Sequence, residues 1–340
     1  MWSSITLLPP STTLAFKSPP ASNPESPSQI FQRLVPRFTP SPAPGVDAIP
    51  ITDSEDTYRS HDMALLHHYT TNTYMTITRS STLQHIWQIL IPNLAFSSPY
   101  LLHCILALSA SHLGQHPPLD STNSNRHYQF LLRNHHKAAI SLFRTQLESI
   151  NPQNGPAIFA FSVLFICLSL SMPAPIDPPF SSQRDKSISF ILHMNTFIRL
   201  VRGIHDVSLI SLPAFLDSPF HELLLIEKTG HKEPLTFDAE VAVRFIEQSV
   251  DTDPALVPLK DGYKAVLQHL RDCNPRRDEK TEQTAIVLIW PVGIPSFFFE
   301  EVEKMRPAAL AILAFFGTLL HGVNREWWKG DSGKKCEFWM

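Results

Sequence analysis

The feature that most constrains this chain is a series of apolar segments with the spacing of α-helices, separated by prolines. In the clearest segment, apolar residues recur at helical spacing, namely Leu83, Ile86, Trp87 and Leu90. Pro92 is expected to stop that helix, because proline has no amide hydrogen to donate. Ser98 followed by Pro99 predicts a new helix with a capping hydroxyl and a proline in its first turn. This part of the chain is therefore predicted to be helical.

The same periodicity predicts helices along most of the remaining sequence. A first helical region begins near residue 60 and carries one face made of Leu66, Tyr69, Thr73 and Ile77. The further expected ranges are 99–114, 125–150, 187–204, 218–229, 238–250 and 257–272. Within 125–150 the inward residues are expected to be Tyr128, Leu131, Leu132, Ala139, Leu142 and Phe143. Asp238 is the expected cap of the helix over 238–250.

Breaks between helices are predicted from polar stretches and from proline positions. Residues 173–186 are expected to form a polar loop, and residues 274–280 a charged turn. Pro291, Pro295 and Pro307 lie where one helix is expected to end and another to begin. The stretch that starts at Pro307, "PAALAILAFFGTLLHG", is apolar on most sides and predicts a core helix.

Composition supports a helical fold class. Glycine is scarce, with 11 residues, which argues against β-sandwiches and glycine-rich phosphate loops, whereas the 30 prolines indicate many helix breaks. The only strand-like run, "IVLIW", is flanked by helical pattern. We therefore predict an all-α protein, a single irregular bundle of about a dozen helices.

The sequence predicts three regions. Residues 1–58 are rich in proline, serine and threonine, so they are expected to be a disordered leader or linker that cannot offset its ordering entropy by burial. Residues 59–330 are predicted to form the helical domain, and residues 331–340 an irregular tail.

The most apolar segment, "GPAIFAFSVLFICLSLSMPAP", raises the question of a membrane span. Its charge-free apolar part falls short of the roughly 20 residues that a membrane-crossing helix needs. It also contains three serines and has prolines on both flanks. It is predicted to be a buried helix of the domain, with no membrane span.

Charge and cysteine content exclude two classes of binding site. The formal net charge is −3, so the chain lacks the basic surplus that usually neutralises nucleic-acid phosphates. The cysteines, Cys104, Cys167, Cys273 and Cys336, are each more than sixty positions apart. No cysteine-pair zinc motif can form at that spacing, and a reducing compartment is indicated.

No catalytic motif is present, so the chain is predicted not to be an enzyme and to have no catalytic residue, metal site or cofactor. The histidines that cluster in sequence are expected to be surface or hydrogen-bonded core residues: His61, His67, His68, His103, His112, His135 and His136. Glu300, Glu301 and Glu303 are expected to form a solvated helix face. The phenylalanines at 297–299, 315 and 316 are expected to be core, with an apolar pocket as the alternative. Arg276, Arg277 and Lys280 are too few for a phosphate site.

Two long stretches carry a recognisable pattern. The first is "LLHHYTTNTYMTITRSSTLQHIWQILIPNLAFSSPYLLHCILALSASHLG". The second is "IWPVGIPSFFFEEVEKMRPAALAILAFFGTLLHGVNREWWKG", which has a tryptophan pair near its end. The two stretches bracket roughly residues 63–330, and they resemble the regulatory domain of fungal zinc-cluster transcription factors of the sterol-uptake-control type. The resemblance implies an all-helical domain that acts in the nucleus.

The resemblance also implies a function and a set of partners. The family regulates sterol or lipid genes and secondary-metabolite gene clusters, and some members bind a lipophilic effector. Its members carry six zinc-binding cysteines near the N-terminus, but the first cysteine here is Cys104, so no direct zinc-cluster DNA contact is expected from these residues. The expected partners are proteins of the transcription machinery or a DNA-binding paralogue, a lipophilic effector and a second copy of the chain. The alternative is a lipophilic small-molecule binding protein without a transcriptional role.

Overall fold

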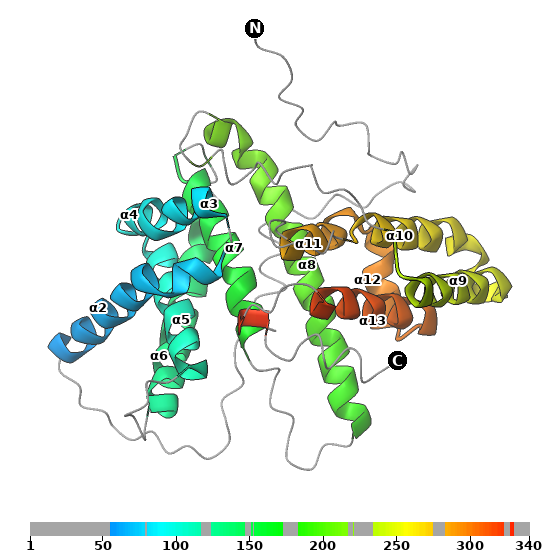
Figure 1. Ribbon diagram of the computed structural model, residues 1–340, viewed down its shortest axis with the longest axis horizontal. Helices are drawn as coiled ribbons and strands as arrows, with labels where there is room; N and C mark the ends of the chain where they lie inside the picture. The colour runs from blue at the N-terminus through cyan, green and yellow to red at the C-terminus, as the bar shows by residue number, and fades with distance from the viewer. Residues whose placement is uncertain are drawn as a thin grey trace, which may run out of the picture.

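The computed structural model describes residues 55–116, 124–172, 183–216, 234–274 and 283–329, with short gaps at 79, 147–150, 152 and 323–326, together with Phe220. Within these ranges the chain is built from α-helices joined by short 3₁₀ and π turns, and it contains no strand (Figure 1). The all-α prediction is confirmed. The leader up to residue 54, most of the helix expected at 218–229 and the tail from residue 330 lie outside the described residues.

The helices follow one another along the chain with few long connections. Their bounds are α2 Glu55–Thr71, α3 Ser81–His85, α4 Ile91–Ala95, α5 Pro99–Gln115, α6 Ser124–Gln146, α7 Gly155–Ser171, α8 Gln183–Leu216, α9 Phe237–Thr252, α10 Lys260–Asp272, α11 Gln283–Gly293, α12 Ser296–Glu303 and α13 Pro307–Gly322. A 3₁₀ turn, Thr73–Thr76, follows α2, and another, Trp327–Lys329, follows α13.

The long helix α8 lies in the middle of the molecule and separates two groups of helices (Figure 1). Helices α2 to α7 lie on one side, and α9 to α13 lie on the other. Helix α8 contacts α7 in the first group and contacts α11 and α12 in the second. Buried apolar residues from both groups and from α8 form one hydrophobic core.

Helix α7 is the most apolar of the core helices, and the way its serines are bonded explains why it tolerates burial. The hydroxyl of Ser162 donates to the carbonyl of Ile158 at 2.7 Å, and that of Ser169 donates to Phe165 at 2.6 Å. Each buried hydroxyl thus finds an acceptor one turn back in its own helix, which avoids the cost of an unpaired polar group. The prediction of a buried helix here is confirmed.

The prediction that Pro92 stops its helix is wrong. The residues before it, Ile86–Leu90, form a π turn, and the amide of Ile91 donates to the carbonyl of Ile86. Pro92 then lies in the first turn of α4, where an amide donor is not needed. The wider π turn therefore lets the helical path continue to Ala95 despite the proline.

Pro291 also fails to break its helix, because it lies within the last turns of α11. Trp290 next to it is fully buried, stacks on Phe316 at 4.6 Å and donates from Nε1 to the carbonyl of Val266 at 3.3 Å. The tertiary packing of Trp290 therefore outweighs the tendency of Pro291 to end the helix. Pro295 and Pro307 do lie at helix boundaries, as predicted.

Several local expectations are corrected by the structure. Helix α2 begins at Glu55, inside the expected leader, and α8 includes residues 183–186 of the expected loop. Thr236 rather than Asp238 caps α9, since its hydroxyl accepts from the amide of Ala239. Ser98 precedes α5 as expected but makes no side-chain cap. Leu142, expected to point inward, is 39% exposed.

Length and apolarity decide whether a helix in the described part of the chain could cross a membrane. No single helix there is long and apolar enough to cross a bilayer. Helices α12 and α13 reach that length and apolarity only as a pair, and the pair is bent by 106°.

Candidate functional site

Four of the histidines that cluster in sequence meet between α2, α5 and α6, where they form two polar contacts that we call the histidine seam: His103 with His135, and His68 with His112. In the first contact, Nδ1 of His103 on α5 lies 2.9 Å from Nδ1 of His135 on α6. Nε2 of His135 in turn donates to the Asp62 carboxylate on α2, at 3.1 Å. When the proton of His135 is on Nε2, its Nδ1 can accept from the Nδ1–H of His103. This contact therefore joins three helices through one chain of hydrogen bonds.

The second contact of the seam lies at the C-terminal ends of α2 and α5. Nε2 of His68 lies 3.3 Å from Nδ1 of His112, and the hydroxyl of Thr73 lies 3.0 Å from the same Nδ1. Burial, together with the nearby His68 and His116, lowers the pKa of His112 to about 4. Burial also lowers the pKa values of His68 and His103. The neutral imidazole is therefore favoured at His68, His103 and His112.

The tryptophan pair near the end of the domain closes over this second contact. The ring of Trp327 stacks on His112 with 4.5 Å between ring centroids and 14° between their planes. Nε1 of Trp327 donates to the Thr76 hydroxyl at 2.8 Å, and Nε1 of Trp328 donates to the Thr76 carbonyl at 2.9 Å. Two indoles therefore tie the end of the helical array to the 3₁₀ turn that follows α2, some 250 positions earlier.

The seam contains residue types that occur in catalytic and metal sites. Its hydroxyl is closed to substrates, however, and it offers too few ligands for a metal ion. The hydroxyl of Thr73 pairs with an imidazole, yet Thr73 is fully buried, so it cannot meet a substrate from solvent. Among the described residues, no group of three or more histidine, cysteine or acidic side chains could hold a metal ion. The seam's evident role is to hold α2 and the tryptophan pair against α5 and α6.

One of the three acidic residues of α12, Glu301, is not part of the solvated face that the sequence predicted. Glu301 is buried, and its carboxylate accepts from Lys304 at 3.0 Å and from the Tyr263 hydroxyl at 3.4 Å. Burial and the nearby Glu301 charge raise the pKa of Tyr263. Glu303 accepts from Arg199 of α8 at 3.0 Å. Glu300 and Glu303 are exposed as predicted, with side-chain exposures of 64% and 41%.

The turn between α12 and α13 explains the burial of Glu301. Met305 adopts a positive φ of 54°, a left-handed conformation that is uncommon for a residue other than glycine. The turn directs Arg306 back, so that its Nε lies 3.6 Å from the Glu301 carboxylate. The buried charge is thereby paired, which is the condition for burying it at acceptable cost.

The phenylalanine cluster belongs to the core, as expected. Phe298, Phe299, Phe315 and Phe316 are all buried, and Phe297 is partly buried against the core. The Phe299 ring also carries the guanidinium of Arg199 at 4.8 Å from its centroid, which fixes α8 against α12. The cations Arg276, Arg277 and Lys280 lie outside the described residues.

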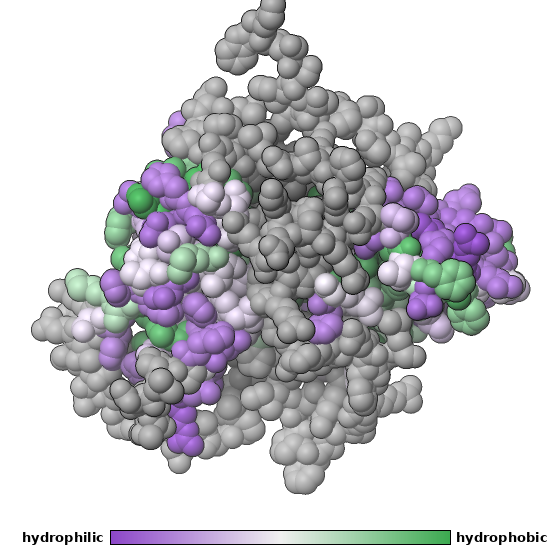
Figure 2. All heavy atoms as spheres, in the orientation of Figure 1, coloured by the Kyte–Doolittle hydropathy of each residue, from purple (hydrophilic) through white to green (hydrophobic). Residues whose placement is uncertain are grey.

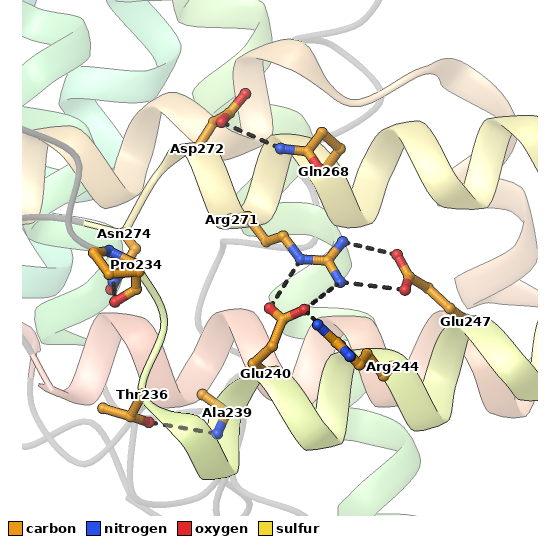
Figure 3. A network of polar contacts seen from close by, with 10 residues as sticks. All are labelled: Pro234, Thr236, Ala239, Glu240, Arg244, Glu247, Gln268, Arg271, Asp272 and Asn274. Atoms are coloured by element: carbon orange, nitrogen blue, oxygen red, sulfur yellow. Dashed lines mark hydrogen bonds and ion pairs between the residues drawn. The ribbon is translucent and has the colours of Figure 1, made fainter.

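A second polar cluster, which sequence reasoning missed, joins α9 to α10 (Figure 3). The Arg271 guanidinium donates through Nε and Nη2 to Glu240, at 3.1 Å each, and through Nη1 and Nη2 to Glu247, at 2.7 and 3.2 Å. Arg244 also donates to Glu240, at 3.1 Å. Arg271 is only 19% exposed, whereas Arg244 is 74% exposed. The helical spacing of Glu240 and Glu247 was a signal that could have pointed to this shared cation.

Arg271→Met is expected to lower the free energy of unfolding by about 2 kcal/mol, between the values for exposed and buried ion pairs. The reason is that two carboxylates lose a doubly forked donor at a partly buried site. Arg244→Met is the matched control, with an expected loss below about 0.5 kcal/mol. Urea unfolding of both variants measures the difference, and equal losses would contradict the assignment of Arg271 as the clamp.

Comparison with known proteins finds a matching family and several similar proteins. Residues 64–225 match the fungal-specific transcription factor domain. A Zn(2)-C6 fungal-type transcription factor of Gibberella zeae is 25% identical over 293 residues, which cover 82% of this chain and 57% of that protein. Sterol uptake control protein 2 of Saccharomyces cerevisiae is 26% identical over 269 residues, covering 78% of this chain and 28% of that protein.

A third relative is the sterol uptake control protein 2 of Candida albicans, 32% identical over 182 residues, or 50% of this chain and 24% of that protein. This chain thus spans from about a quarter to a little over half the length of these relatives. The resemblance seen in the sequence is confirmed: residues 64–225 match the fungal-specific transcription factor domain, and the three relatives are a zinc-cluster transcription factor and two sterol uptake control proteins.

Proposed function

We propose that this chain regulates transcription in the nucleus by contacting protein partners, and that its target genes serve sterol or lipid metabolism or a secondary-metabolite cluster. The observation that carries the proposal is the match of residues 64–225 to the fungal-specific transcription factor domain. The names of two relatives, both sterol uptake control proteins, support the sterol assignment. A lipophilic effector, which would fit that assignment, is part of the proposal.

The charge of the chain supports action through partners. Its formal net charge of −3 offers no basic surplus for phosphate contacts. The chain instead presents mixed surfaces in which acids and bases alternate, as around α9 and α10. Proteins of the transcription machinery or a DNA-binding paralogue are therefore the proposed partners.

The alternative function, a lipophilic small-molecule binding protein without a transcriptional role, has no separate observation in its favour. It was based on the phenylalanines of α12 and on the apolar α13. Phe298 and Phe299 are buried against the rest of the core, as are Phe315 and Phe316. These rings are already accounted for by packing.

The proposal can be tested by fusing the full 340-residue chain to a heterologous DNA-binding domain in a fungal reporter strain. We expect reporter expression to change several-fold relative to the DNA-binding domain alone, and the change to depend on sterol supply. The matched control is the same fusion carrying Arg244→Met, which should behave as the parent. An unchanged reporter, together with unaltered sterol-gene and cluster transcripts after deletion of the gene, would refute a transcriptional role.

A further inference from the structure

Helix α6 carries a row of basic side chains along one side, which we call the basic stripe. Its members are Arg126, Arg133, Lys137 and Arg144, at successive intervals of seven, four and seven positions. Because an α-helix turns by about 100° per residue, these intervals return to nearly the same direction, within about 20° on either side. The basic stripe therefore runs straight along the helix, over about 27 Å at 1.5 Å per residue.

The basic stripe lies on the outer side of α6. Its first three members are exposed, and Arg144 is partly buried. The opposite side of the helix packs mainly on α5 and is buried through Leu131, Leu132 and Ala139. Figure 2 shows hydrophilic side chains on the surface of the part of the molecule where α5 and α6 run. The cations of the stripe are therefore presented to solvent on a helix whose inner side is anchored in the core.

The basic stripe does not stabilise the helix that carries it. Helix α6 contains no aspartate or glutamate, so none of its cations has an acid one turn away on the same helix. Arg133 and Lys137 are themselves one turn apart, which is a repulsive spacing, and Arg126 lies in the first turn, where the helix dipole favours acids. No side chain of the stripe forms an ion pair or hydrogen bond within the described part of the chain, and Nε of Arg144 is closed to solvent without a partner. Four cations that their own chain leaves unused indicate an acidic partner.

We propose that the basic stripe binds an acidic, helix-forming segment of a partner protein. A partner helix has the same rise per residue, so carboxylates seven, four and seven positions apart on it meet the four cations in turn. The order of the intervals is the same in both directions, so the partner helix fits in either orientation. Phe130, partly buried against the core, lies one turn from Arg126 and offers an apolar contact between the cations. This inference rests on the proposed function and deepens it, because it names the chemistry of the protein partner.

The distribution of charge favours an acidic protein segment over nucleic acid. The chain as a whole carries a formal net charge of −3, although α6 carries four cationic side chains and no acidic ones. A long polyanion such as DNA interacts with the whole surface, so the negative surplus outside α6 repels it. A short acidic segment meets mainly the stripe, because exposed charges more than about 8 Å away are screened at physiological salt.

The first test uses two labelled synthetic peptides and the full chain. The matched peptide is an alanine-based helix of about 25 residues, long enough to be helical alone, with its glutamates on one face at the intervals of the stripe. The control peptide has the same composition with the glutamates distributed around the helix. Fluorescence anisotropy should show that the matched peptide binds at least about fivefold more tightly, the gain from one or two exposed ion pairs, and that added salt weakens it. Equal affinities for the two peptides would overturn the alignment with a partner helix.

The second test reverses the charge at the centre of the stripe. Arg133→Glu combined with Lys137→Glu should raise the Kd for the matched peptide at least about tenfold, while the helical circular dichroism stays unchanged. The matched control is Arg244→Glu combined with Lys264→Glu, which makes the same change in net charge at exposed positions of α9 and α10. This control should bind the peptide as wild type does. Equal losses in the two double variants would reveal a general charge effect and overturn the stripe as the site.

Competition and the reporter assay separate the remaining outcomes. If a short DNA duplex displaced the matched peptide at lower concentration than unlabelled peptide does, the protein partner would be overturned and the stripe assigned to phosphate binding. A chain that regulates the reporter but binds neither peptide overturns this inference and leaves the transcriptional role standing. A chain that binds the matched peptide through the stripe but leaves the reporter unchanged supports the binding site and counts against the transcriptional role.

Discussion

Trp328→Ala is expected to lower the free energy of unfolding of the full chain by about 3–5 kcal/mol, the range for truncating a buried tryptophan. Trp328 is only 4% exposed, and its indole donates to the Thr76 carbonyl. The 3₁₀ turn that carries it packs against α7 and α5. The substitution therefore opens a cavity and leaves a carbonyl without its donor. Urea unfolding followed by circular dichroism measures the loss.

The control for this prediction is Phe96→Ala, an aromatic truncation at a position that is 64% exposed. Its expected loss is below about 1 kcal/mol, because little apolar surface returns to water. If Trp328→Ala lowered the free energy of unfolding as little as Phe96→Ala does, the tryptophan pair would not be what holds the C-terminal part of the helical array to the 3₁₀ turn after α2. Such a result would remove the main structural link between the 3₁₀ turn Thr73–Thr76 and the C-terminal part of the array.

The helices themselves were predictable because their signals are local. The apolar run of α7 and the proline-led run of α13 contain their own boundaries, and both helices were found where the pattern placed them. The errors at Pro92 and Pro291 share a cause. A proline forbids one hydrogen bond, but a π turn or a buried neighbour such as Trp290 can keep the helical path. The residues next to the proline in the sequence do not indicate whether a π turn or a buried neighbour will keep the helix going.

The histidine seam could not be predicted, because its contacts connect distant positions. His68 and His112 are 44 positions apart, and Thr76 and Trp328 are 252 apart. Spacing along a helix says which residues share a face, but not which face meets another helix. The same limit explains Glu301, whose burial depends on the backbone turn at Met305 and on Tyr263 from another helix. Sequence reasoning identified the right residue types and assigned them to solvent or to ordinary core.

We expect His136 to make the protein sensitive to acid, and its replacement by leucine to remove about 3 kcal/mol of the stability lost on acidification. The side chain is fully buried and stacks on Phe165 with 5.6 Å between ring centroids. Neither ring nitrogen has a hydrogen-bond partner among the described residues. Burial lowers the pKa of His136 to about 4, against about 6.5 for an unfolded chain. Each pKa unit corresponds to about 1.4 kcal/mol, which gives the expected size of the effect.

The sign of the effect follows from which state binds the proton. Above about pH 6.5 the residue is neutral in both states and contributes no pH dependence. Between about pH 6.5 and 4 the unfolded chain binds the proton first, so stability falls as the pH falls. His112, with its pKa lowered to about 4, and His68 and His103, also lowered, act in the same direction. These residues remain in the His136→Leu variant, so the difference between the two proteins isolates His136.

The measurement is urea unfolding of wild type and His136→Leu at closely spaced pH values from 7.5 to 4. At pH 7.5 the variant should be at least as stable as wild type, because leucine has a similar volume and brings no unpaired polar atoms into the core. The stability difference should then grow in the variant's favour by about 3 kcal/mol on acidification. If the free energies of unfolding of the two proteins changed in parallel with pH, His136 would bind a proton as readily in the folded state as in the unfolded state. Any loss of stability in acid would then have to come from the histidine seam, and replacing His112 would be expected to reduce that loss.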